Sequence, residues 1–239
     1  MFDPWTFRHL DDIGVGPGWR CWEVGAGGTS VVWWFAGRVG STGRVLATDL
    51  DVSHVEHAQG GPVEVRRHEV GTEVPPVEVF DVVHARLLLV HVARREQALR
   101  AMVSVLRPEE WLVVEEADPA LQPLSCIDRV TEEAELANRI RTGFRSLMAG
   151  RGVDLAFGRT LPRRLRQAGL HDVRADAFFP VASPDTVTLE LATIDMVGPM
   201  LVEAGTVTEG ELARHVATVG QGHLDLAQPP LVTAWGRRL

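Results

Sequence analysis

A glycine turn between two acidic residues constrains this chain more than any other feature. Residues 23–29 read EVGAGGT, and residues 43–51 read GRVLATDLD. Glu23 closes an apolar, strand-like segment, and the glycines after it permit a sharp turn and the close approach of a ligand to the backbone. Asp49 follows the turn by about twenty residues, where nucleotide-binding α/β folds place an acid on ribose hydroxyls. The pattern predicts a β-α-β unit with a ligand site at its turn.

Two classes of cofactor use this layout, and the residue types discriminate between them. A dinucleotide site has the pattern G-x-G-x-x-G, because the N-terminus of a helix must meet a pyrophosphate. Here Ser30 stands where the third glycine would fall, and Glu23 would repel a nearby phosphate. S-adenosylmethionine (SAM) has a cationic ammonium and a ribose but no phosphate, so it suits a Glu-Gly-x-Gly turn. The residues therefore predict SAM rather than NAD as the cofactor.

Four segments together resemble the class I SAM-dependent methyltransferases of the small-molecule type found in actinobacterial metabolism. They are GPGWRCWEVGAGG (16–28), GRVLATDLD (43–51), FDVVHARLLLVHV (80–92) and LRPEEWLVVEE (106–116). The resemblance covers residues 5–116 well, and residues 155–182 and 230–238 more loosely. It implies a single SAM-binding domain over residues 1–239, with an α/β fold: a doubly wound, mostly parallel, seven-stranded Rossmann-like sheet.

Apolar periodicity and turn residues give the same alternation of strands and helices, which is typical of a parallel sheet covered on both faces. The expected strands are 19–25, 43–49, 62–70, 80–85, 111–116, 171–181 and 230–236. The expected helices between them are 5–13, 29–40, 51–60, 94–106 and 160–169. Two longer insertions, 118–158 and 184–226, are expected to be helical and to form a cap over the strand ends that shapes an acceptor pocket. In the second insertion, Thr208 and Glu211 have the spacing of a capping box.

Ligands of such sheets bind at the carboxyl ends of the strands, which places the candidate residues along one edge. Glu23 is expected to hold the methionine ammonium, and the Asp49 carboxylate to accept hydrogen bonds from both ribose hydroxyls. Glu69 is either a contact of the adenine amine or a solvated loop acid, and Asp51 is expected to be a loop acid that caps the following helix. The predicted cofactor-binding residues are Glu23, Gly25, Ala26, Gly27, Asp49, Leu50, Glu69, Val70 and His84.

His84 is also the candidate catalytic residue, because this fold directs groups after the fourth strand toward the transferred methyl. Its near-neutral pKa suits a general base, but the alternative is a pocket wall without a proton role, since methyl transfer proceeds by proximity alone in many relatives. A carboxylate from Glu115, Glu116 or Asp118 is expected to decide whether His84 is a base. The predicted substrate-lining residues are Arg86, His91, Glu116 and Asp118, and no metal site is predicted.

Two segments depart from the pattern of the resembled family. Thr29 stands where a third glycine is common, and its hydroxyl is expected to cap the helix that follows. The residues Pro108, Glu109 and Glu110 replace a Pro-Gly-Gly turn, and we expect this change to cost local stability without affecting function.

The composition of the chain limits the classes of partner that it is expected to bind. The formal net charge of -8 and the isoelectric point near 5.6 disfavour a nucleic-acid partner. No apolar run reaches the length of a membrane span and no leader pattern occurs, so a cytoplasmic protein is expected. The two cysteines allow neither a disulfide framework nor a zinc pattern.

The sequence therefore predicts a SAM-dependent methyltransferase that methylates a small-molecule acceptor of natural product biosynthesis and releases S-adenosylhomocysteine. A homodimer is among the expected assemblies. Two alternatives stay open: a SAM-binding enzyme that does not methylate, for example a cyclase, and a non-catalytic partner subunit.

Overall fold

The structure is a computed structural model that describes residues 1–128 and 131–239, and the chain divides into two compact units. The sheet unit comprises Phe2–Glu116, Phe157–Ala177 and Val232–Leu239, and the helical unit comprises Met1, Ala117–Ala156 and Phe178–Leu231. The helical unit therefore contains most of the two expected insertions, of which residues 129–130 lie outside the described part. A single functional domain over residues 1–239 stays a prediction.

Seven strands form one mostly parallel sheet, as expected. The strands are β1 (Arg20–Val24), β2 (Arg44–Asp49), β3 (Val63–Arg67), β4 (Phe80–Arg86), β5 (Leu106–Ala117), β6 (Leu170–Phe178) and β7 (Leu231–Arg238), in the order β3-β2-β1-β4-β5-β7-β6. β1 pairs in parallel with β2 and β4, β2 with β3, and β4 with β5. The direction of chain progression reverses between β1 and β4, which is the point where open α/β sheets bind ligands.

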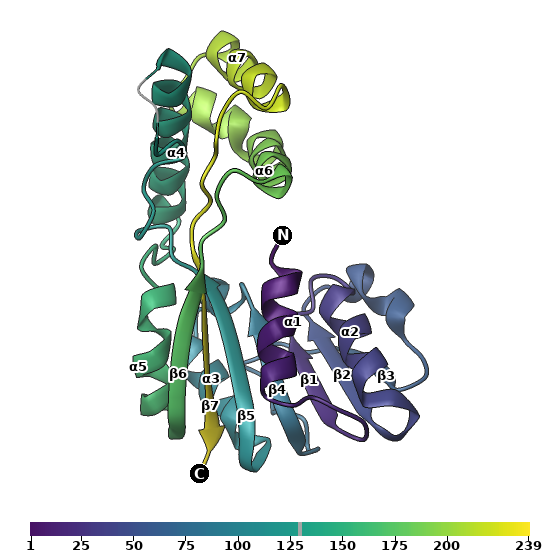
Figure 1. Ribbon diagram of the computed structural model, residues 1–239. Helices are drawn as coiled ribbons and strands as arrows, with labels where there is room; N and C mark the ends of the chain where they lie inside the picture. The colour runs from purple at the N-terminus through teal and green to yellow at the C-terminus, as the bar shows by residue number, and fades with distance from the viewer. Residues whose placement is uncertain (129–130) are drawn as a thin grey trace. The chain divides into compact units, whose positions relative to one another are not determined.

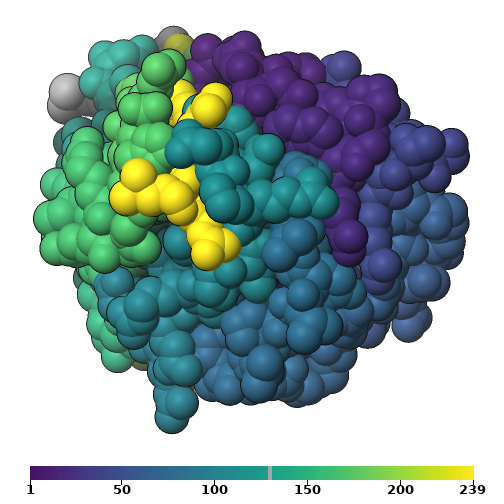
Figure 2. Space-filling model, turned by 90° about the horizontal axis from the view of Figure 1, so that it is seen from below, coloured from purple at the N-terminus to yellow at the C-terminus, as the bar shows by residue number. Residues whose placement is uncertain are grey.

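The last strand is inserted between β5 and β6 and runs against them (Figure 1). Seen from below, the yellow C-terminal segment lies between teal and green segments of the chain (Figure 2). The sheet is therefore doubly wound, with one reversed strand near its edge.

Helices cover both faces of the sheet because its central strands are apolar on both sides. They are α1 (Asp3–Asp12), α2 (Ser30–Val39), α3 (Arg95–Ser104) and α5 (Leu161–Gln167). On one face, Cys21 of β1 packs in a core with Leu10 of α1 and Phe35 of α2. On the other, Trp22 packs in a core with residues of α3 and α5. Adjacent residues of one strand thus hold helices on opposite faces.

The helical unit contains α4 (Glu132–Gly150), α6 (Pro184–Glu203) and α7 (Glu209–Gly220). A side-chain oxygen caps the N-terminus of each of these helices. Thr131 caps α4, and capping boxes start α6 at Ser183 and α7 at Thr208. The expected capping box of Thr208 and Glu211 is confirmed. Within residues 1–128 and 131–239, no helix combines the length and apolarity that a membrane crossing requires.

Two local expectations about helices were wrong. The expected helix over 51–60 is two 3₁₀ turns, Val52–His54 and Glu56–Ala58, in which the Asp51 side chain accepts a hydrogen bond from the Ser53 amide at 3.0 Å. That hydrogen bond caps only the first of the two turns. Gly60 and Gly61 follow the second turn directly and leave no room for a longer helix. The loop-acid role of Asp51 is confirmed.

Thr29 does not cap α2 through its hydroxyl, because its own backbone is already helical (φ −94°, ψ −8°). A capping residue needs extended backbone to aim its side chain at the first amides. Pro108, Glu109 and Glu110 form no separate turn before β5, but lie within that strand. The register shifts between Phe80 and Val82 of β4, and Glu109 has φ 65°, in the left-handed region.

Candidate cofactor site

The glycine turn after β1 lies at the reversal point of the sheet, and its first glycine is sterically required. Gly25 has φ 72°, and a Cβ at this position would lie 2.8 Å from Cδ1 of Leu88. The amides of Gly25 and Ala26 both donate to the carbonyl of Thr48, at 2.8 and 2.9 Å. In contrast, added Cβ atoms at Gly27 and Gly28 would meet nothing within 4 Å. The turn is therefore anchored to β2, and its second half borders open space.

A cavity opens beside this turn, with about 450 Å³ of space for the centres of water molecules. Its walls come from the turn after β1, the end of β2, the loop after β3 and the segment after β4. The lining residues are Val24, Gly25, Asp49, Leu50, His68, Glu69, Val70, Thr72, Leu88, His91, Val92, Ala93 and Arg94. All belong to the sheet unit.

Most of the predicted cofactor residues meet in this cavity. Gly25, Asp49, Leu50, Glu69 and Val70 line it, and so does His91, which was expected to line the substrate site. The cavity does not include Glu23, Ala26, Gly27 or His84 among its lining residues.

Asp49 and Glu69 are the half-buried acids of the cavity, at the ends of neighbouring strands. One Asp49 carboxylate oxygen accepts the Asp51 amide at 3.0 Å, and the carbonyl of Asp49 accepts the His68 amide at 3.0 Å. These two bonds fix the end of β2 and the direction of the carboxylate. The arrangement offers hydrogen-bond acceptors where a polar ligand would lie across β2 and β3.

Glu23 and His84 meet each other rather than the cavity. Because β1 pairs with β4 with Glu23 opposite His84, both side chains lie on the same face, and His84 Nδ1 lies 2.6 Å from a Glu23 oxygen. On the other side, His84 Nε2 lies 3.4 Å from Glu115 of β5. Burial opposes a charge on His84, but the two carboxylates outweigh that effect and raise its pKa to about 9.

These contacts bear on the two roles considered for His84. At neutral pH the ring is an imidazolium with both nitrogens facing carboxylates, so it has no free lone pair to accept a proton. The side chain is also fully buried and outside the cavity lining. The geometry therefore favours a structural charge network over a general base, and Glu115 is the carboxylate that supports it.

Helix α1, which precedes β1 in the sequence, completes this network. The hydroxyl of Thr6 accepts a hydrogen bond from Arg86 at 2.9 Å and donates to Glu115. Thr233 of β7 donates to the other oxygen of Glu115 at 2.7 Å. Arg86 also pairs with Asp3 at 2.9 Å, so it serves to anchor α1. Isolated threonines carry no sequence signal, and sequence reasoning missed both of them.

Glu116 supports the cavity wall from behind. Its Oε1 accepts the amides of Leu89 and Val90, at 2.5 and 3.3 Å, in the 3₁₀ turn Leu89–His91. Burial raises the pKa of Glu116 to about 7, against the opposing effect of these backbone hydrogen bonds. Glu116 was expected to line the substrate site, but its contacts show that it orders the segment that lines the cofactor cavity.

The last candidate, Asp118, belongs to the helical unit, where its carboxylate accepts the Leu121 amide at 3.1 Å. Across the described ranges 1–128 and 131–239, no group of three or more His, Cys, Asp or Glu side chains could hold a metal ion.

Comparison with known proteins is consistent with this architecture. Residues 22–114 match a protein family described as a methyltransferase domain. The ubiquinone/menaquinone biosynthesis C-methyltransferase UbiE of Vibrio parahaemolyticus is 31% identical over 130 residues, which are 51% of this chain and 50% of that protein. The chain thus spans about half the length of the curated relatives it matches.

Solved structures share the fold over nearly the whole chain. Phosphoethanolamine N-methyltransferase 2 of Haemonchus contortus, solved with S-adenosylhomocysteine, has a TM-score of 0.61 at 12% identity, covering 98% of this chain and 52% of that one. The [4+2]-cyclase SpnF has a TM-score of 0.56 at 15% identity, covering 99% and 81%.

A methyltransferase domain on a seven-stranded, Rossmann-like sheet defines the class I SAM-dependent methyltransferases. Residues 22–114 of this chain, which are less than half of its length, match that family.

Proposed function

We propose that the protein transfers the methyl group of SAM to a small-molecule acceptor. The observation that carries this proposal is the cavity at the reversal point of the sheet, which joins the glycine turn to Asp49 and Glu69. Asp49 accepts the ribose hydroxyls, and Glu69 accepts the amine of the adenine. An acid at the position of Asp49 suits the ribose of either cofactor, but Ser30 stands where a dinucleotide site has its third glycine, which supports SAM over NAD.

The remaining contacts follow from the lining of the cavity. The backbone of the turn from Gly25 lies against the methionine part, and Arg94, an exposed cation on the lining, balances its carboxylate. Glu23 is held by His84 and does not line the cavity, so its expected contact with the ammonium stays a prediction.

SAM supplies an activated methyl group whose leaving group needs no protonation. The protein therefore has to align the acceptor with that methyl and exclude water, rather than move protons. The imidazolium state of His84 agrees with transfer by proximity. The relatives named as C-methyltransferases support a carbon nucleophile in the acceptor. An acceptor from natural product biosynthesis and a cytoplasmic location stay predictions.

Calorimetric titration with S-adenosylhomocysteine, SAM and NAD tests the cofactor assignment. We expect saturable binding of the first two and none of NAD. Methyl transfer from radiolabelled SAM to a panel of phenols, enols and amines tests the reaction. The cyclase SpnF shares this fold, so binding without methyl transfer would favour the non-methylating alternative. Binding of neither SAM nor S-adenosylhomocysteine would overturn the proposal and favour a non-catalytic partner.

A further inference from the structure

The sheet unit contains a second hollow, the α1 groove, which offers about 510 Å³ to the centres of water molecules. Its walls come from the end of α1 and from β5, β6 and β7, in stretches that all belong to the sheet unit. The lining residues are His9, Asp12, Ile13, Trp111, Arg174, Trp235 and Arg237. None of them lines the cofactor cavity, so the proposed function leaves this groove without a role.

The α1 groove lies on the face of the sheet that α1 covers, because side chains alternate between the two faces along each strand. Trp111 and Trp235 pack against the core that contains Leu10 of α1. Val173, the neighbour of Arg174 in β6, packs against the core on the opposite face, so Arg174 points to the α1 side. Figure 1 shows α1 in front of the sheet and β6 at its edge. The helix is thus a ridge beside the groove, and the strands form the floor.

The floor of the α1 groove is aromatic and only partly covered. Trp111 and Trp235 are partly buried, and neither indole N–H has a hydrogen-bond partner in the part of the chain that the structure describes. The guanidinium of Arg237 lies over the Trp111 ring, 4.3 Å from its centroid, and the ring of His9 meets that of Trp235 at 4.9 Å. Tryptophan and arginine are enriched among the residues that contribute most to protein–protein binding. The floor therefore has the composition of an interface centre.

Two charges of opposite sign border this floor without a partner. The other charged residues of the lining are paired, His9 with Asp176 at 2.8 Å and Arg237 with Glu109 at 3.8 Å. Asp12 and Arg174 are exposed, and neither side chain makes a hydrogen bond or ion pair with any residue in the ranges 1–128 and 131–239. Asp12 is the last residue of α1, whereas Arg174 lies on the edge strand β6. The acid therefore belongs to the ridge, and the base to the strand side of the groove.

We propose that the α1 groove is the contact surface between two copies of this chain related by a two-fold axis. In such a contact both copies use the same surface, so one face has to supply a ridge with its groove and an acid with its base. The ridge α1 of each copy lies in the groove of the other, over the two tryptophans. Asp12 of each copy then faces Arg174 of the other, which gives two ion pairs at the rim of an aromatic centre. The presence of both signs favours a second copy over an anionic or a cationic ligand.

Sedimentation velocity over a concentration series of the full chain tests this surface, and we expect the wild type to dimerise. Asp12→Arg would place two bases opposite each other at both rim positions, and Arg174→Asp would place two acids there. Either variant should therefore weaken dimerisation by about tenfold or more, since two ion pairs are replaced by two repulsions. Both residues are exposed, so the variants should keep the circular dichroism spectrum of the wild type.

An equimolar mixture of Asp12→Arg and Arg174→Asp provides the sharpest test. In a mixed dimer one copy offers two bases and the other two acids, so both ion pairs form again and dimerisation should return to near the wild-type level. An attraction between Asp12 and Arg174 of the same copy would not be restored by mixing. The mixture therefore reports only on contacts between copies.

Arg166→Asp is the matched control for the change of charge. Arg166 is exposed on α5, which packs on the opposite face of the sheet, and its side chain has no ion pair or hydrogen bond with the described residues. This variant should dimerise like the wild type, and it should not replace Arg174→Asp in restoring a dimer with Asp12→Arg.

Three results would each overturn the proposal. They are a wild type that stays monomeric throughout the series, single variants that dimerise as the wild type does, and a mixture of Asp12→Arg with Arg174→Asp that stays monomeric. A monomeric wild type would leave the groove to a different partner or to a small molecule. Dimers that ignore both substitutions would place the contact on another face.

Discussion

The Asp49 carboxylate is the single side chain on which the cofactor assignment depends most. Asp49→Ala should weaken binding of S-adenosylhomocysteine by about 1–3 kcal/mol, the usual cost of losing hydrogen bonds to a charged group. Stability should change little, since the side chain is half-buried at a strand end. Calorimetric titration measures the effect. Asp51→Ala is the control, because the Asp51 side chain accepts the Ser53 amide of its own loop and does not line the cavity. A loss confined to the Asp51 variant would transfer the ribose role to that residue.

His84 should make the stability of the protein depend on pH. Its pKa rises from an ordinary 6.5 to about 9 in the folded state, so its charge stabilises the fold fully below pH 6.5. That contribution, on the order of 3 kcal/mol, is lost as the pH rises toward 9. Glu116, whose pKa burial raises to about 7, also lowers stability with rising pH, but only below pH 7.

The window from about pH 7 to 8 therefore reports mainly on His84, because the Cys21 thiol, whose pKa burial raises well above its ordinary value, lowers stability only closer to pH 9. Urea denaturation should give a free energy of unfolding that falls across this window in the wild type. His84→Gln, which has no titrating ring, should be less stable at pH 7 but show no such fall. The same pH dependence in both proteins would mean that His84 is neutral in the fold, which would restore the possibility of a general base.

Sequence reasoning found the cavity residues at this scale but missed their neighbours. Gly25, Asp49 and Glu69 were predictable because strand ends and glycine turns can be recognised in the amino-acid sequence. The pairing of Glu23 with His84 was not, because it depends on the register of β1 against β4. A shift of one residue would send the two side chains to opposite faces.

At the scale of elements, β5 positions the cavity wall through Glu116. Removing its carboxylate leaves the amides of Leu89 and Val90 buried without their acceptor, so the wall from Leu88 to Arg94 should loosen. Glu116→Ala should weaken binding of S-adenosylhomocysteine by about tenfold, or 1.4 kcal/mol, although Glu116 does not line the cavity.

Glu116→Gln provides the control, since its amide keeps an oxygen that accepts both N–H groups. Its cofactor affinity should stay within about twofold of the wild type. Calorimetry at pH 8, where the wild-type carboxyl is ionised, measures both variants. Equal affinity in Glu116→Ala and the wild type would show that the wall holds its shape without this acid.

Elements with strong local signals were predictable, and those decided by tertiary contacts were not. The alternation of apolar segments gave the strands, and Thr208 with Glu211 gave the start of α7. The segment over 51–60 reads as a weak helix, but the Asp51 turn and the glycines at its end divide it. The irregularity after Leu106 lies where the register of β5 against β4 shifts, and no local pattern in the sequence reveals that shift.

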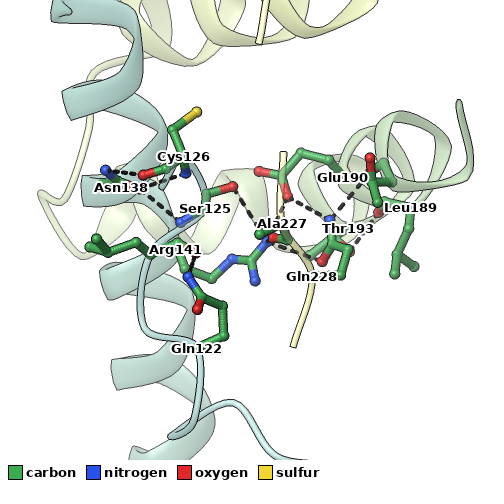
Figure 3. Close-up of polar contacts among 12 residues, drawn as sticks. Gln122, Ser125, Cys126, Asn138, Arg141, Leu189, Glu190, Thr193, Ala227 and Gln228 are labelled. Carbon is green, nitrogen blue, oxygen red and sulfur yellow. Dashed lines mark hydrogen bonds and ion pairs between the residues drawn. The ribbon is translucent and has the colours of Figure 1, made fainter. Parts of the chain in front are cut away.

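At the scale of the whole molecule, the two units differ in how much of their structure could be predicted from the sequence. The cofactor cavity is lined by the sheet unit alone, where the sequence contains motifs. The helical unit has capping boxes but no recognisable ligand-binding motif, and Arg141 of α4 there donates to Glu190 of α6 and to Gln228 before β7, more than eighty residues along the chain (Figure 3). That the insertions 118–158 and 184–226 form a cap over the cofactor stays a prediction. Hydrogen exchange with and without S-adenosylhomocysteine tests it through protection in either segment.

The last prediction concerns how far stability of the helical unit and cofactor binding are separable. Arg141→Met leaves Glu190 buried with only His215 and Gln228 as partners, which should cost about 3–5 kcal/mol. Hydrogen exchange should therefore accelerate in α4 and α6. Cofactor affinity should stay within about twofold, because no residue of the helical unit lines the cofactor cavity.

The double variant Arg141→Met with Glu190→Leu controls for the unpaired charge. It removes both members of the ion pair, so much of the lost protection should return. Protection that stays low in the double variant would assign the loss to packing rather than to charge. A fall in cofactor affinity that parallels the loss of protection would show that the two units act as one cooperative structure, since a cavity formed by the sheet unit alone has no other reason to respond to Arg141.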